Sequence, residues 1–132
     1  MGARCLTVFE DKNEEIAVIY RQMDGYLDGH GLDLAKMYSG MTIVNGISDN
    51  QKVFNGIGCL AAQTVANLKT RPGGIYLHKA GTRDVGEDYI YTVYGEIGDE
   101  PMVLVSDSHK VIIYDGTASN LKKFIESQQE ES

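Results

Sequence analysis

The clearest hydrophobic pattern in the chain lies between residues 52 and 69. Side chains suited to a buried face recur there at a spacing of three and four: Val53, Ile57, Leu60, Ala61, Thr64, Val65 and Leu68. This spacing predicts a helix over residues 52–69, capped at its start by Asp49 or Asn50. The run Arg71-Pro72-Gly73-Gly74 is expected to end it.

The same helix carries a stripe of small side chains at Gly56, Cys59, Ala62 and Ala66. Glycine costs about 1 kcal/mol relative to alanine inside a helix, so its presence suggests that another surface packs closely there. Two alternatives follow. The surface is the sheet of the same domain, or it is a ligand or a second subunit of a homo-oligomer.

Shorter runs of β-branched and aromatic residues predict strands. Residues 4–9 and 15–21 are expected to form a hairpin, residues 41–47 a brief strand, and residues 74–78, 89–96, 102–106 and 110–114 an antiparallel meander. Two further helices are expected near residues 32–38 and 119–127. The order ββα(β)αββββα predicts an α+β fold with about three helices and a mainly antiparallel sheet. One domain spans residues 1–132, with residues 128–132 as a frayed tail.

Composition narrows the classes of partner. The 132 residues are 42% hydrophobic and 23% charged, which is typical of one folded domain. The net charge of −7 disfavours nucleic acid as a partner, because binding to phosphate backbones needs a clustered basic surface. No run approaches the roughly 18 apolar residues of a membrane span, and the N-terminal residues lack the apolar core of a signal peptide. A cytoplasmic location is therefore expected, without membrane contact.

Cofactor chemistry has little support in the sequence. Cys5 and Cys59 are predicted to be buried, reduced thiols that do not pair. His30, His78 and His109 are isolated from one another and lack the spacing of metal ligands. Neither standard glycine-rich nucleotide motif is present. We therefore expect no cofactor and no metal.

The densest polar cluster lies at a predicted strand-to-helix junction and contains Arg21, Asp24, Tyr26 and His30. Glycines on both sides of His30, at positions 29 and 31, permit N–H groups to converge on a phosphate or carboxylate near the helix N-terminus. Arg83, from the loop over residues 80–87, is the fourth charged side chain expected at this end of the sheet. Alternatively, Asp24 and Asp28 serve only as turn and cap residues, and Arg21 forms a salt bridge with one of them.

Four segments carry a resemblance to known proteins. They are Met1-Gly2-Ala3-Arg4, Ile19-Tyr20-Arg21-Gln22-Met23-Asp24-Gly25-Tyr26, Val44-Asn45-Gly46 and Gly56-Ile57-Gly58-Cys59-Leu60-Ala61-Ala62-Gln63. The first half of the chain thereby resembles a group of small phage and bacterial proteins of unknown activity, which often begin Met-Gly-Thr-Arg and carry an aromatic-Asp-Gly-Tyr-Pro turn. This chain departs from that pattern at Leu27 and Met23. The resemblance implies a phage or mobile-element origin and no mechanism.

Two functional hypotheses follow. The first is a non-enzymatic binding or interaction protein that recognises a small anionic ligand or a host protein. The alternative is a small hydrolase or transferase in which Asp24 and His30 act as acid and base, with a cysteine as nucleophile. If His30, Asp24 and Arg21 converge in a cleft, both hypotheses for this site stand, and if the three side chains extend into solvent, both fall.

Overall fold

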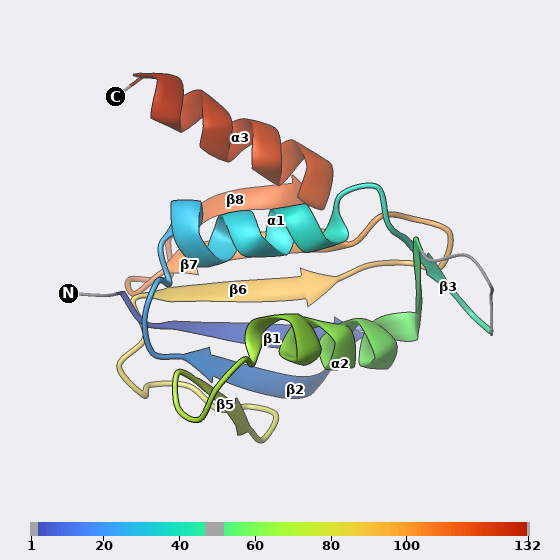
Figure 1. Cartoon of the computed structure of the whole chain (residues 1–132), viewed down its shortest axis with the longest axis horizontal. Coiled ribbons are helices and arrows are strands. Elements are labelled where there is room, and N and C mark those ends of the chain that lie inside the picture. Colours follow the sequence, from blue (N-terminus) through green and yellow to red (C-terminus); the bar gives the residue numbers. More distant parts are fainter. Residues whose placement is uncertain (1–2, 47–51, 132) are drawn as a thin grey trace.

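The computed structural model describes residues 3–46 and 52–131, and it has the α+β fold and the element order expected from the sequence (Figure 1). Six strands form one sheet in the order β5-β2-β1-β6-β7-β8. Their bounds are β1 Cys5–Asp11, β2 Glu14–Arg21, β5 Ile75–His78, β6 Tyr89–Tyr94, β7 Met102–Asp107 and β8 Ile112–Thr117.

The helices of the described chain gather on one face of this sheet (Figure 1). Their bounds are α1 Leu32–Tyr38, α2 Gly56–Leu68 and α3 Ala118–Glu131, with a π-helical turn, η1 Leu27–Gly31, leading into α1. A separate parallel pair of short strands, β3 Thr42–Val44 and β4 Val53–Asn55, precedes α2. No helix within the described ranges is both long and apolar enough to cross a bilayer.

Alternation along β1 divides its side chains between the two faces of the sheet. Cys5 and Phe9 are fully buried in the main core under the helices, while Leu6 and Val8 belong to a second, smaller cluster on the opposite face. A strand buried on both faces must be central. β1 accordingly pairs antiparallel with β2 and parallel with β6.

The expected four-strand meander is only partly correct. β6, β7 and β8 pair in antiparallel succession, but β5 pairs with β2, and β6 pairs with β1. β5 and β6 are not neighbours because the ten-residue connection between them, residues 79–88, crosses the sheet and lets the two strands run parallel. Antiparallel neighbours need only a short turn, so the length of this loop is the feature that argues for a crossover.

The helix predicted over residues 52–69 begins later, at Gly56, because residues 53–55 form β4. Gly56 has a φ of 81°, and no side-chain cap precedes it. Asp49 and Asn50, the predicted caps, lie outside the described residues. The predicted apolar face is correct in its centre, where Ile57 and Leu60 are buried.

The small side chains of α2 do not pack on the sheet. Cys59, Ala62 and Ala66 are exposed, so the first explanation for the stripe is wrong. Cys59 is consequently exposed and not buried as predicted, whereas Cys5 is buried; both thiols are free. Cys59 directly precedes the buried Leu60. Because cysteine behaves as a small apolar residue, we expected it to be buried, although it lies outside the buried face of the helix.

The C-terminal helix is longer than predicted. α3 continues through Glu131, so residues 128–131, expected to fray, are helical, and Ser132 lies outside the described residues. Glu100 stabilises the other end of α3, because its carboxylate accepts hydrogen bonds from the Ser119 amide at 2.5 Å and hydroxyl at 2.9 Å. A carboxylate at a helix N-terminus also interacts favourably with the helix dipole.

Replacing Leu60 with alanine is expected to lower the free energy of unfolding by about 2–5 kcal/mol, because Leu60 is fully buried between α2 and the sheet. Urea unfolding measures the change. Gln63→Ala is the matched control, since Gln63 lies on the exposed side of the same helix and should change stability by less than about 0.5 kcal/mol. Equal stability of the two variants would contradict this packing.

Candidate functional site

His30 is the buried centre of the polar cluster predicted from the sequence. Its side chain is fully buried, and both ring nitrogens have partners: Nε2 lies 2.6 Å from Oγ1 of Thr7, and Nδ1 lies 3.1 Å from Nη1 of Arg21. The ring also packs edge-on against Tyr91, with centroids 4.8 Å apart. Four elements, β1, β2, β6 and η1, therefore meet at one imidazole.

The neighbours of His30 fix its tautomer. A guanidinium can only donate hydrogen bonds, so Nδ1 of His30 must accept one from Arg21. The single proton of the neutral ring then lies on Nε2, which donates to Oγ1 of Thr7. Burial, together with the positive charge of Arg21, lowers the pKa of His30 to about 3.

The chain between β2 and α1 reaches this position through its backbone. Asp24 has a φ of 65°, and its carbonyl oxygen accepts the His30 amide at 2.7 Å. Gly25 packs so closely on the start of β1 that a Cβ atom there would lie 2.9 Å from the carbonyl carbon of Arg4. The hydroxyl of Tyr91 donates to the Gly25 carbonyl at 2.7 Å. The Asp-Gly pair thus closes a turn over the end of the sheet at which β1 begins.

The predicted anion site at the glycines around His30 is wrong. The amides of Gly29 and Gly31 donate to the carbonyl of Tyr26, and that of His30 donates to Asp24. These N–H groups already have acceptors inside the turn and do not converge on a ligand. α1 is also only seven residues long.

Arg21 forms an ion pair that the sequence interpretation did not name. Its Nη1 lies 2.7 Å from Oδ2 of Asp33, in the first turn of α1, so the ion pair is with Asp33 and not with the predicted Asp24 or Asp28. The Arg21 side chain is 18% exposed and that of Asp33 42% exposed. Arg21 is therefore anchored on one side by His30 and Asp33 and reaches solvent on the other.

Two hollows open on the solvent side of Arg21. The first, of about 360 Å³, lies between the end of β2 and the turn that follows α2, and it is lined by Arg21, Asp24 and Arg71 among others. The second, also of about 360 Å³, lies toward α1 and is lined by Arg21, Asp33 and Lys36 with apolar neighbours. Leu68 lines both hollows, so they adjoin at the end of α2.

Arg71 and Lys36 are exposed, and neither side chain forms a hydrogen bond or ion pair with any residue in 3–46 or 52–131. Both were missed as site residues. Arg71 was taken only as part of a helix-ending run, and Lys36 was given no role. The position of Asp33 could have been inferred from the sequence. Residues three apart on a helical segment share a face, and Asp33 follows His30 by three, so the two side chains are expected on the same side.

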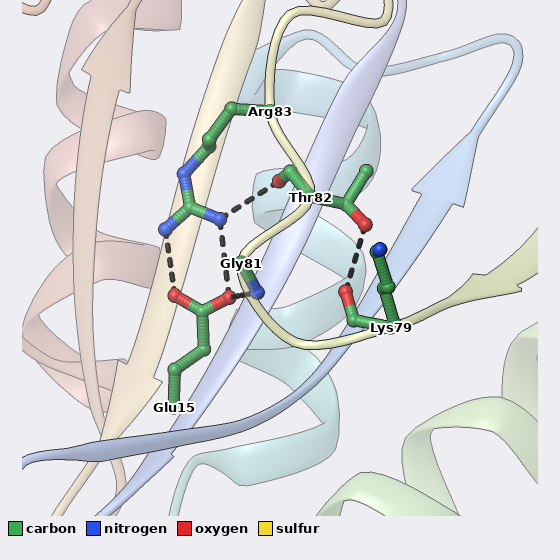
Figure 2. A network of polar contacts seen from close by, with 5 residues as sticks. All are labelled: Glu15, Lys79, Gly81, Thr82 and Arg83. Carbon is green, nitrogen blue, oxygen red and sulfur yellow. Dashed lines mark hydrogen bonds and ion pairs between the residues drawn. The ribbon is translucent and has the colours of Figure 1, made fainter.

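Two predicted site residues lie elsewhere. Tyr26 lines a different hollow, against Tyr89 and the end of α3. Arg83 lies at the opposite end of β2 from Arg21, where its Nη2 is 2.8 Å from Oε1 of Glu15 and its Nη1 is 3.2 Å from Oε2 (Figure 2). The hydrogen bond from Arg83 lowers the pKa of Glu15. Of the five predicted residues, Arg21, Asp24 and His30 come together.

The geometry gives little support to acid–base or nucleophilic chemistry at this cluster. His30 has no exposed surface, and its nitrogens face Thr7 and Arg21 and no thiol. Burial raises the pKa of Cys5 to about 12, so this thiol stays protonated at neutral pH. Among the residues described, no three His, Cys, Asp or Glu side chains are grouped to hold a metal ion.

The neutral state of His30 makes stability depend on pH. Its folded pKa, about 3, lies below the roughly 6.5 of an unfolded histidine, so its contribution is complete above about pH 6.5 and declines as the pH falls toward 3. Between about pH 6.5 and 4.5 we expect a loss of roughly 2–3 kcal/mol in the free energy of unfolding, measured with urea. His30→Gln should flatten this slope. In the parent protein, the ring proton signals of His30 should not titrate in this interval by NMR; a midpoint near 6.5 would contradict the assignment.

Removing the Arg21 side chain should weaken the fold without abolishing it. Arg21→Ala leaves the buried Nδ1 of His30 without a donor, which costs about 1–3 kcal/mol. Arg71→Ala is the matched control, because Arg71 is exposed, and its thermal midpoint should stay unchanged. Equal midpoints for the two variants would show that the contact between Arg21 and His30 contributes nothing to stability.

The comparisons with known proteins leave this geometry as the basis for assigning a function. No protein-family model, no curated protein and no solved structure matches the chain.

The residues of the site divide into two groups. His30 and Asp33 hold Arg21 in place, with Thr7 bonded to the far side of the His30 ring. Arg21, Arg71 and Lys36 present positive charge to solvent.

Proposed function

We propose that this chain is a non-enzymatic binding protein that recognises an anionic group between Arg21 and Arg71. The observation that carries the proposal is the hollow of about 360 Å³ at the end of β2, where two guanidinium groups from separate elements line one surface. Guanidinium groups match the geometry of carboxylates and phosphates, with which they form paired, charge-assisted hydrogen bonds.

Arg21 is suited to recognition because its position is set before any ligand arrives. Contacts with His30 at 3.1 Å and Asp33 at 2.7 Å fix one side of the guanidinium. An arginine already held in place loses less conformational entropy on binding than a mobile one. The chain as a whole is acidic, with a net charge of −7, so clustered exposed cations at one place are a local reversal of the surface charge.

Asp24 shapes the kind of anion that fits. It lines the same hollow as Arg21 and Arg71, so the three side chains together carry one net positive charge. A ligand that bears a hydrogen-bond donor beside its anionic group satisfies Asp24 as well as the two arginines. A bare inorganic anion would lie near an unpaired carboxylate and is expected to bind more weakly.

Binding is favoured over the hydrolase or transferase alternative, since His30 is inaccessible and the lining of the hollow contains no histidine, no cysteine and one carboxylate, Asp24. The resemblance of the first half of the chain to phage and bacterial proteins supports an origin in a phage or mobile element. We propose a cytoplasmic location, where the ligand is either a small anion or an acidic part of a host protein.

Arg71→Gln tests this proposal without disturbing the buried network. In a thermal-shift and calorimetric panel of phosphate, pyrophosphate, citrate and adenosine monophosphate, at least one anion should stabilise the parent protein. Arg71→Gln should bind it about tenfold more weakly, the loss expected of one charge-assisted hydrogen bond. Lys123→Gln on α3 removes the same charge away from the hollow and should bind normally. The proposal fails if no anion distinguishes Arg71→Gln from the parent.

A further inference from the structure

The two hollows beside Arg21 form one extended surface, and this continuity says more about the ligand than either hollow alone. Both are lined by Arg21 and Leu68, and each has its own exposed cation, Arg71 in the first and Lys36 in the second. Together they offer a groove with positive charge at each end and at its middle. A single small anion occupies only one of these positions.

The groove is also apolar along part of its length. Leu68 and Met37 are half-buried and line the hollow toward α1, while Met23 and Pro72 are exposed and line the hollow toward the turn after α2. Met23 is 54% exposed, a high value for a thioether side chain. Flexible methionines at a surface adapt to varied apolar side chains, which is why they recur at peptide-binding surfaces.

Negative groups in the groove are few and have defined roles. Asp33 lies 2.7 Å from Arg21, so the charges of these two side chains partly compensate each other, while Arg71 and Lys36 have no such partner among the described residues. Asp24 is the other carboxylate, and it needs a donor from the ligand. A peptide backbone supplies N–H donors at every residue, whereas citrate or phosphate at neutral pH supplies few or none.

We propose that the occupant of this groove is an acidic peptide segment of a partner protein, with carboxylates on both sides of an apolar residue. The carboxylates pair with Arg71, Arg21 and Lys36, the apolar side chain lies on Leu68 and the methionines, and a backbone N–H group donates to Asp24. This inference rests on the proposed function, because both require an anion at Arg21 and Arg71, but it adds Lys36 and the apolar floor.

The test uses the intact chain and a fluorescein-labelled peptide, Glu-Glu-Leu-Glu-Glu, in an anisotropy titration at about 50 mM salt, where surface charge is weakly screened. Two control peptides replace glutamate with glutamine or leucine with serine. We expect Lys36→Gln and Arg71→Gln each to weaken binding about threefold or more, and the double variant tenfold or more. Lys123→Gln should stay within about twofold of the parent, and both control peptides should bind more weakly.

The outcomes separate the two proposals. Citrate and phosphate binding should respond to Arg71→Gln and not to Lys36→Gln. If small anions behave in this way but the acidic peptide does not bind, or binds independently of Lys36, the peptide inference is overturned and the proposed function stands. If neither small anions nor peptide respond to Arg71→Gln, both are overturned. Self-association that the double variant abolishes would identify a second copy as occupant and also overturn the peptide inference.

Discussion

The contact between Arg21 and His30 is the constraint around which one half of the molecule is arranged. A cation 3.1 Å from a buried imidazole is tolerable only while that imidazole is neutral and accepts a hydrogen bond from the guanidinium. The remaining ring N–H then requires an acceptor, which Thr7 on β1 provides at 2.6 Å. The geometry of one histidine thereby ties together β1, β2 and η1, and Asp33 adds α1 through Arg21.

This arrangement separates two roles within a segment that appears in the sequence as one polar cluster. Asp24, Gly25 and the glycines around His30 serve the turn through their backbone atoms. Arg21 links the buried network to the exposed groove, and its partner Asp33 also lines that groove. Arg21 lies on a rigid strand and is held by buried neighbours. The same contacts therefore stabilise the fold and orient the guanidinium for recognition.

The parts of this structure that depend on local patterns could be predicted from the sequence, and those that depend on pairing over distance could not. The apolar face of α2 and the hairpin of β1 and β2 follow from side-chain periodicity. The partner of β5 does not, because alternation reveals that a strand has two faces but not which strand lies beside it. For the same reason Arg71 could not be linked to Arg21, and Arg83 was assigned to the wrong end of β2. The supposed anion site failed because amide groups beside glycines can find acceptors within their own turn.

The crossing loop between β5 and β6 has a consequence for how the chain first becomes folded. The central strand β1 has one partner nearby, β2, while its other partner, β6, comes much later: the Arg4 amide bonds to Asp88, 84 positions away. At a synthesis rate of about 5–20 residues per second, roughly 4–17 s pass between the two. During that interval the backbone edge of β1 at Leu6, Thr7 and Val8 is without its partner strand, and in this state a newly made chain is most exposed to pairing with another copy of itself.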